Sequence, residues 1–402
     1  MSRTYAVAAL AAVAVLLPAA TASAALYGHS FLYAGNFDDA QVQRLSVTPD
    51  GTLGVSTSYA AGLETTALII APDAGALFAG SIGAARIDSY AVGADGGLAS
   101  TATTPAAHSV DLAMTPDGAF LYGVKSDSGA SSTGTFGGFA VSGTTLTPLA
   151  ATHVLPSSHI ASAIAISPDG SSLYVAASDT HDGSSGFVYR YGIDGATGSL
   201  SGPTLVASGF TAPVFNLALT PDGLSLYAPS PSAGSVYQFD VTPSTGALTP
   251  KAAAAVTTGS APYSMTVTPN GRFAYANGQF DVTGFAVDPA TGSLSTVGSP
   301  MSTSFLGRFG AVSPDSRNLY VTAYPVHHFG IDPATGVLTP RGSGVGGSRF
   351  HVGLLDPDAH RLDPVTRASV PRLKLVDGSL GAGSRRRSWS RRRACSGRCR
   401  RR

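Results

Sequence analysis

Charged side chains, cysteines and long apolar segments are all scarce in this sequence of 402 residues. Charged residues make up only 12% of the chain, and Glu64 is the only glutamate beside 23 aspartates. The two cysteines, Cys395 and Cys399, lie near the C-terminus, so disulfides cannot hold the rest of the chain together. Beyond the first 24 residues no segment is long and apolar enough to predict a transmembrane helix.

The N-terminus has the pattern of an export signal. Arg3 precedes an apolar run over residues 8–20, and Ala22, Ser23 and Ala24 form a small-residue cleavage site. An uncleaved membrane anchor is the alternative, but the apolar run is short for a span. We therefore predict a cleaved signal peptide over residues 1–24 and a secreted, periplasmic or cell-envelope protein.

Glycine and proline are abundant, with 48 and 26 copies, and many of them lie in a repeated turn. The repeat reads Pro-Asp-Gly or a close variant, followed by an apolar or aromatic pair. Proline sets φ at the second turn position, and glycine accepts the positive φ that such turns need. The seven turn prolines recur at intervals of 43 to 53 residues: Pro72, Pro116, Pro168, Pro221, Pro269, Pro314 and Pro357.

A second repeated hairpin alternates with the first. It begins at an aromatic residue or leucine before a short strand and a glycine turn, as in FAVDPATGSLS. Its seven starts are Leu45, Tyr90, Phe139, Tyr191, Phe239, Phe285 and Phe329. Two hairpins per period of 40 to 50 residues are typical of a β-propeller. The sequence therefore predicts an all-β, seven-bladed propeller of four-stranded antiparallel blades over residues 25–362.

The two ends of the repeat complement each other. Phe31 to Asn36 (FLYAGN) resembles a second strand without its preceding turn, whereas FHVGLL, from Phe350, resembles a first strand without the rest of a blade. We predict that the C-terminal strand pairs with the N-terminal strands and closes the ring, which removes its open edges. The aromatic residues after the turns, such as Tyr122 and Tyr320, are expected to wedge between adjacent blades.

The repeat stops near residue 362. Residues 363–384 are predicted to be a linker, and residues 385–402, with ten arginines and no acidic residue, a disordered tail. Without that tail the chain has 15 basic and 24 acidic residues, a net charge of −9, so specific nucleic-acid binding by the propeller is not expected. The tail itself could contact anionic envelope surfaces, bind nucleic acid non-specifically or have no evolved role.

Both hairpin motifs resemble those of the seven-bladed lactonase family, which includes propeller-type 6-phosphogluconolactonases and carboxymuconate-lactonising enzymes. The resemblance rests on hairpins such as SPDGSSLY and FGIDPATGVLTP and covers roughly residues 27–362. It implies a propeller fold and a lactone as substrate. The fold alone does not establish an activity, because propellers with the same hairpin motifs also include proteins that only bind ligands or act as scaffolds.

Candidate site residues gather where the innermost strand of each blade is expected to begin, at one mouth of the central channel. A carboxylate or an imidazole there can activate water, which assigns Glu64 and His108 as catalytic residues. Guanidinium and imidazole groups can bind a substrate carboxylate or phosphate and a developing oxyanion. The predicted substrate-binding residues are Arg308, Arg349, His159 and His351.

These residues predict hydrolysis of a small, anionic lactone at the channel mouth, in a monomer. No metal or cofactor motif is present in the sequence, so neither a metal nor a cofactor is expected. The alternative is a non-catalytic extracellular binding module that presents its loops to a protein or glycan partner. The two functions differ in whether Glu64, His108 and Arg349 converge in one pocket.

Overall fold

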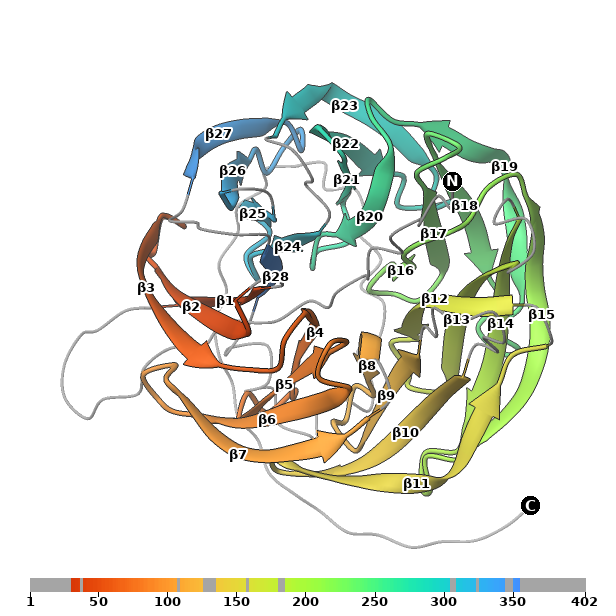
Figure 1. The fold of residues 1–402 in the computed structure, drawn as a ribbon. Helices are drawn as coiled ribbons and strands as arrows, with labels where there is room; N and C mark the ends of the chain where they lie inside the picture. Colours follow the sequence, from red (N-terminus) through yellow and green to blue (C-terminus); the bar gives the residue numbers. More distant parts are fainter. Residues whose placement is uncertain are drawn as a thin grey trace, which may run out of the picture. The chain divides into compact units, whose positions relative to one another are not determined.

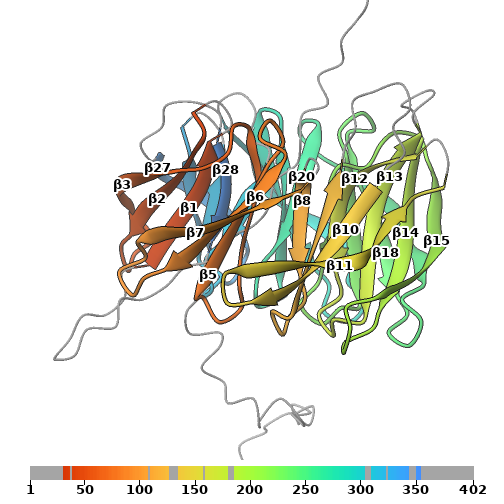
Figure 2. The same cartoon turned by 60° about the horizontal axis from the view of Figure 1, so that its bottom comes forward.

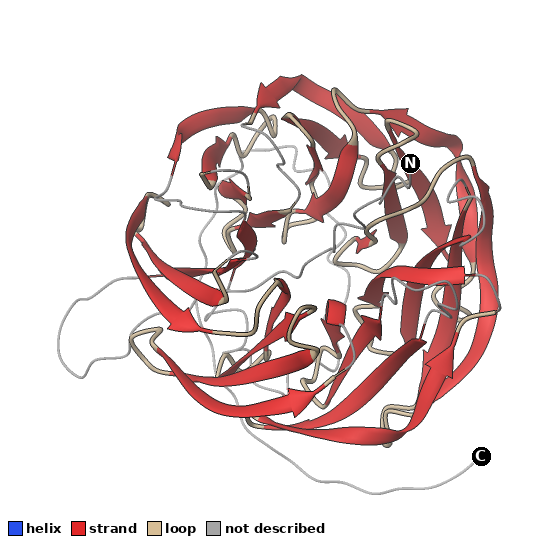
Figure 3. Cartoon of the chain, in the orientation of Figure 1, coloured by secondary structure: helices blue, strands red, loops and turns tan. Residues whose placement is uncertain are grey.

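The computed structural model describes residues 30–36, 39–106, 109–125, 135–156, 159–179, 185–303, 309–322, 325–343 and 350–354. The predicted signal peptide, linker and arginine-rich tail lie outside these residues. Within the described residues the only regular elements are β-strands, which form seven four-stranded antiparallel sheets. Figure 1 shows these sheets as blades around a ring, and Figure 3 shows that strands dominate every blade. The predicted seven-bladed propeller is confirmed.

Each blade is numbered by its position in the chain, and its strands are given from the channel outward. Blade 1 contains β28 (Phe350–Leu354), β1 (Ser30–Asn36), β2 (Gln41–Val47) and β3 (Leu53–Ala60). Blade 2 contains β4 (Thr65–Ile70), β5 (Ala76–Ser81), β6 (Arg86–Val92) and β7 (Leu98–Pro105). Blade 3 contains β8 (Ser109–Met114), β9 (Phe120–Lys125), β10 (Thr135–Ser142) and β11 (Thr145–Val154).

The remaining four blades follow the same order. Blade 4 contains β12 (His159–Ile166), β13 (Ser172–Asp179), β14 (Gly186–Ile193) and β15 (Leu200–Phe210). Blade 5 contains β16 (Ala218–Leu219), β17 (Ser225–Ser230), β18 (Ser235–Val241) and β19 (Leu248–Thr257). Blade 6 contains β20 (Pro262–Val267), β21 (Phe273–Gly278), β22 (Asp281–Val287) and β23 (Leu294–Ser302). Blade 7 contains β24 (Gly310–Val312), β25 (Asn318–Val321), β26 (His327–Ile331) and β27 (Leu338–Ser343).

Blade 1 closes the ring by joining the two ends of the repeat. β28 pairs antiparallel with β1, from Leu32 opposite Leu354 to Asn36 opposite Phe350. Figures 1 and 2 both show β28 beside the N-terminal strands. The predicted closure is confirmed, and it supplies β1 with backbone partners on both sides, β28 and β2.

The alternation of antiparallel strands gives the ring two different faces. Both repeated hairpins turn at the same end of the strands, which we call the turn face. The connections between blades, and those between second and third strands, lie at the opposite end, which we call the mouth face because the innermost strands begin there. Figure 2 shows the strands running between these two ends.

Six tyrosines on second strands connect each blade to the next. Each is almost completely buried, and its hydroxyl donates to the carbonyl of a glycine in the outer turn of the following blade, over 2.6 to 3.0 Å. The pairs are Tyr33–Gly96, Tyr122–Gly198, Tyr174–Gly246, Tyr227–Gly292, Tyr275–Gly336 and Tyr320–Gly51. The predicted wedging of these rings between blades is confirmed. Each such hydrogen bond contributes about 1 kcal/mol net.

The pair between Tyr320 and Gly51 crosses the closure from blade 7 to blade 1. Gly51 has a φ of 89°, and a Cβ there would lie 2.3 Å from the Oδ1 of Asn318. Only glycine fits both the backbone conformation and this close approach. In blade 2 the equivalent second-strand residue is Phe78, which is fully buried but has no hydroxyl to donate.

Candidate functional site

Two of the six predicted site residues, Glu64 and His159, have described side chains. His108, Arg308 and Arg349 lie outside the described residues. The backbone of His351 pairs with Gly35 in β28, but its side chain also lies outside them. Convergence of these six residues in one pocket therefore stays a prediction.

Glu64 ends the loop that leads from blade 1 into β4, on the mouth face. Its φ is 57°, in the left-handed region that residues other than glycine adopt uncommonly. Its carbonyl accepts a hydrogen bond from the Ile82 amide at 3.0 Å, which ties the loop to the turn between β5 and β6. Backbone strain of this kind persists only where the surroundings hold it, and it often marks a functional site.

Several hydrogen bonds hold the Glu64 loop, residues 61–64, and the residues on either side of it. The Tyr90 hydroxyl donates to the Ala60 carbonyl at 2.5 Å, and the Thr65 hydroxyl donates to the Gly62 carbonyl at 2.9 Å. The Gly62 amide donates to Oδ2 of Asp88 at 2.7 Å. These bonds fix the backbone that carries Glu64 before any ligand arrives, which is what a catalytic group requires.

The side chain of Glu64 lies along the turn between β5 and β6. A Cβ on Gly83 would come within 3.2 Å of the Cγ, Cδ and Oε2 atoms of Glu64, so the carboxyl group rests against that glycine. None of the ion pairs recorded among the described residues involves Glu64. Its carboxylate is only partly buried and can meet water on the mouth face.

His159 begins β12, two blades further round the ring. Its Nδ1 lies 2.7 Å from the Tyr189 hydroxyl oxygen, and its ring stacks on Phe187 with centroids 4.0 Å apart. Burial lowers the pKa of His159 below its usual value and so favours the neutral ring, against an opposing effect of the Asp179 carboxylate. The innermost strand of blade 3, β8, stands between β4 and β12 (Figure 1).

An ion pair beside Glu64 adds two residues that the sequence-based prediction misses. At the start of β6 the Nε of Arg86 lies 2.8 Å from Oδ1 of Asp88. The Asp88 side chain is 3% exposed and that of Arg86 is 38% exposed. The sequence-based site prediction considers only the innermost strand of each blade, whereas these two residues lie on β6, the third strand of blade 2. A sequence signal for this pair does exist: Arg86 and Asp88 carry opposite charges at positions i and i+2, which share one face of a strand.

Asp111 is a second carboxyl group close to the channel, on β8. Both of its oxygens accept backbone hydrogen bonds: Oδ1 from Leu112 at 2.9 Å and Oδ2 from Ile164 in blade 4 at 3.0 Å. Asn216 of blade 5 makes the equivalent bond to Met265 of blade 6 at 3.0 Å. Asp111 is 5% exposed and bridges two innermost strands, so its position fits a structural role better than water activation.

Burial raises the pKa of Asp111 to about 7, although the two amide bonds lower it. A carboxyl whose pKa is higher in the folded than in the unfolded chain binds more protons when folded. Its contribution to stability is complete below about pH 4 and is lost as the pH rises to about 7, with a slope near 1.4 kcal/mol per pH unit. Replacing Asp111 with Asn should remove this loss.

We therefore expect the melting temperature of Asp111→Asn, relative to the unaltered protein, to increase between pH 5 and pH 8. Differential scanning calorimetry in buffers across this range measures the difference directly. Asn216→Ala serves as a control that disturbs the equivalent bridge without a titrating group. A constant difference between Asp111→Asn and the unaltered protein across the range would contradict the raised pKa.

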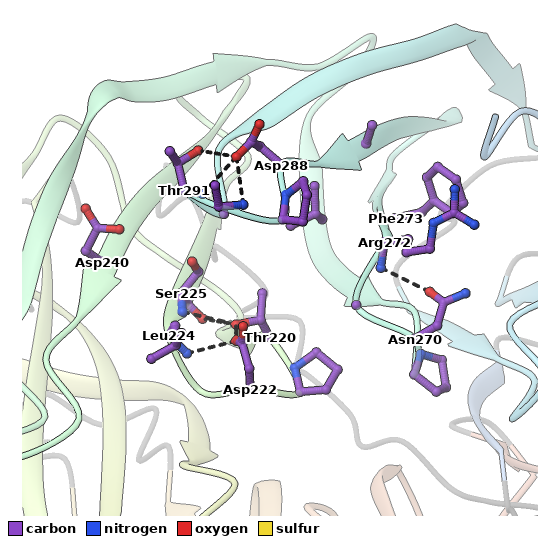
Figure 4. Close-up of a pocket in the computed structure, with 18 of the residues that line it drawn as sticks. Thr220, Asp222, Leu224, Ser225, Asp240, Asn270, Arg272, Phe273, Asp288 and Thr291 are labelled. Carbon is purple, nitrogen blue, oxygen red and sulfur yellow. Dashed lines mark hydrogen bonds between the residues drawn. The ribbon is translucent and has the colours of Figure 1, made fainter. Parts of the chain in front are cut away.

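A groove of about 820 Å³ lies on the turn face, between the turns of blades 5 and 6 (Figure 4). Two of its carboxylates, those of Asp222 and Asp288, are engaged by their own turns. Asp222 accepts from the Leu224 amide at 3.0 Å, and Asp288 accepts from the Thr291 amide at 2.8 Å. The buried Lys251 donates to Asp240 and to the Thr291 carbonyl. The groove lies at the opposite end of the strands from Glu64 and has no predicted site residue in its lining.

No cluster of three or more His, Cys, Asp or Glu side chains suited to a metal ion occurs in the described part of the chain. Likewise, none of its segments is a helix that could span a membrane. The sequence predicts neither a metal nor a cofactor, and this stays a prediction.

The seven blades and the closure of their ring by β28 define this protein as a seven-bladed β-propeller. Residues 37–224 match the family model of the SMP-30/gluconolactonase/LRE-like region, and residues 175–278 match that of the seven-bladed β-propeller lactonases. The chain thus resembles the propeller lactonases in sequence as well as in fold, as its hairpins predict. A search of the curated proteins gave no significant match.

Solved structures show the same architecture. A Bacteroides fragilis protein, provisionally described as a 6-phosphogluconolactonase, has a TM-score of 0.68 and 18% identity and covers 82% of this chain and 99% of its own. The periplasmic gluconolactonase of Pseudomonas aeruginosa has a TM-score of 0.68 and 21% identity, with coverage of 81% and 99%. At these identities the likeness concerns the fold.

Proposed function

We propose that this protein is an exported lactonase that hydrolyses a small, anionic lactone at the mouth face of its channel. The matches to two lactonase family models support the reaction class. The observation that carries the site is Glu64, held in a left-handed conformation with a carboxylate that has no ion-pair partner among the described residues. The N-terminal signal pattern supports export, to the periplasm, the cell envelope or the medium.

The proposed chemistry uses water and the side chains of the predicted site. The Glu64 carboxylate accepts a proton from water as the water oxygen adds to the lactone carbonyl carbon. The ring C–O bond then breaks, and the released alkoxide takes a proton back from Glu64, which yields the hydroxy acid. Arg308 and Arg349 are the predicted cations for the developing oxyanion. His108 is the alternative base, in which case Glu64 orients the imidazole.

A panel of sugar and aliphatic lactones, with and without a carboxylate or phosphate, tests this proposal. Hydrolysis is followed by proton release in weakly buffered solution with the purified mature protein. We expect rates above the buffer blank for at least one small lactone and a preference for anionic members of the panel. Rates equal to the blank throughout would favour a non-catalytic binding module that presents its loops to a protein or glycan.

A further inference from the structure

We propose that Arg86 forms an anion-binding subsite beside Glu64, with Asp88 as its positioning residue. The subsite would hold the carboxylate or phosphate of the lactone while its ring lies over Glu64. This inference rests on the proposed lactonase function. It assigns the recognition of the anionic group of the substrate to Arg86, whose side chain lies within the described residues.

The strand register places Arg86 and Glu64 at the same end of blade 2. Thr65, which follows Glu64, pairs with Ser81 of β5, and Ser81 pairs with Arg86 of β6. Adjacent strands are separated by about 4.8 Å, so the two backbones are roughly 10 Å apart. The Glu64 carboxyl rests against Gly83, in the turn that leads directly to Arg86. A small lactone with one anionic substituent is long enough to reach both groups.

Asp88 links the guanidinium to the loop that carries Glu64. Its Oδ1 lies against the Nε of Arg86, and its Oδ2 accepts from the Gly62 amide. The Asp88 side chain is almost completely buried, so its carboxylate meets both partners away from water, although Arg86 itself is 38% exposed. Any movement of Arg86 is thereby coupled to the position of the Glu64 loop.

The outer edge of the Arg86 guanidinium remains available for a ligand. Asp88 faces Nε at 2.8 Å as an ion pair without hydrogen-bond geometry, and no hydrogen bond from the two terminal nitrogens is recorded within the described residues. Two terminal N–H groups in a fixed plane match a carboxylate or phosphate in a bidentate manner. A side chain that is 38% exposed is open to a ligand yet partly removed from water, which strengthens such contacts.

Three other cations of the described residues make contacts between blades on the turn face. Arg44 donates to the Asp95 carbonyl at 2.7 Å, and Arg272 donates to the Pro333 carbonyl at 2.8 Å. Lys251 likewise donates to the Thr291 carbonyl. Each of these groups holds a turn of the next blade. Arg86 differs because it lies on the mouth face and its recorded contact is the ion pair between Nε and Asp88.

The decisive measurement compares a phosphorylated sugar lactone with its unphosphorylated counterpart. We expect Arg86→Gln to raise KM for the phosphorylated lactone at least tenfold. The kcat for that lactone, and both kcat and KM for the unphosphorylated lactone, should change less than twofold. Asp88→Asn keeps an acceptor for Gly62 but loosens Arg86, so it should raise KM for the phosphorylated lactone several-fold. Arg272→Gln, on the turn face, is the matched control and should leave all four constants unchanged.

A binding measurement separates this inference from the proposed function. Titration calorimetry with a phosphorylated sugar acid should give at least tenfold weaker binding to Arg86→Gln than to the unaltered protein, whether or not a lactone is hydrolysed. If Arg86→Gln does not fold, Arg86→Lys, which keeps the charge but not the planar fork, should weaken binding several-fold.

Two outcomes would overturn the subsite. One is that the protein hydrolyses lactones and Arg86→Gln leaves its preference for the phosphorylated lactone unchanged. That result would not contradict the proposed lactonase function. The other is absence of any binding of the phosphorylated acid to the unaltered protein. Failure to hydrolyse any lactone, with Arg86-dependent binding retained, would instead contradict the proposed function alone.

Discussion

A chain that ends at Gly347 is expected to lose the closed ring, with a loss of several kcal/mol in stability and aggregation of the product. The truncation removes β28 and leaves one side of β1 without its backbone partners, from Leu32 to Asn36. β28 also contacts β4 and β24, the innermost strands of the neighbouring blades. An exposed edge beside the buried Tyr33 is a template for pairing with other chains.

Thermal unfolding and size-exclusion chromatography measure this effect. The control is a chain that ends at residue 362, which retains β28 and lacks the predicted linker and arginine-rich tail. We expect the control to be monomeric, with an unaltered melting temperature, and the shorter chain to elute as aggregates. Equal melting temperatures and elution volumes for the two chains would show that closure by β28 contributes little to stability.

Replacement of Glu64 by Gln is expected to lower kcat for lactone hydrolysis at least a hundredfold. The amide has nearly the same shape as the carboxylate but cannot accept a proton from water, and general bases commonly contribute factors of this size. Since none of the recorded ion pairs in the described part of the chain involves Glu64, the substitution should change the free energy of unfolding by less than about 0.5 kcal/mol. Initial rates and thermal unfolding of the two proteins give both values.

Two further variants define the role of Glu64. Gly83→Ala would press on the Glu64 carboxyl, which lies 3.2 Å from the added Cβ, and should lower kcat by a smaller factor while the carboxylate remains. If His108→Ala abolishes turnover and Glu64→Gln reduces it only slightly, the imidazole is the base and Glu64 orients it. Undiminished turnover in all three variants would place the reaction elsewhere on the molecule.

The fold could be predicted almost completely because its determinants are local and repeated. Each turn proline, such as Pro168 or Pro221, marks a hairpin whose geometry depends on a few neighbouring residues. The alternation of two hairpins then leaves only one way to use the fragments around Phe31 and Phe350. The same regularity predicts the buried tyrosines, although only the structure shows that their hydroxyls bond to glycines of the next blade.

The candidate site could be predicted only in part, because its residues lie on connections that do not repeat. The sequence predicts Glu64 from its place at the start of an innermost strand, but its left-handed backbone is held by an amide of another hairpin, that of Ile82. The sequence likewise predicts His159 at the start of an innermost strand, yet the structure packs its ring against Phe187. The spacing of turns does not encode the direction of a side chain in a loop.

By itself, the sequence determined the number of blades, the turns and the strand that closes the ring, since turn residues and strand alternation act over a few positions. Only the tertiary structure decided that Asp88 joins Arg86 to Gly62, residues 24 positions apart. That contact requires the Glu64 loop to pack on the end of β6, with Gly62 so close to Ser81 that a Cβ would not fit. Packing between distant segments, and not local chemistry, therefore sets the geometry of the proposed site.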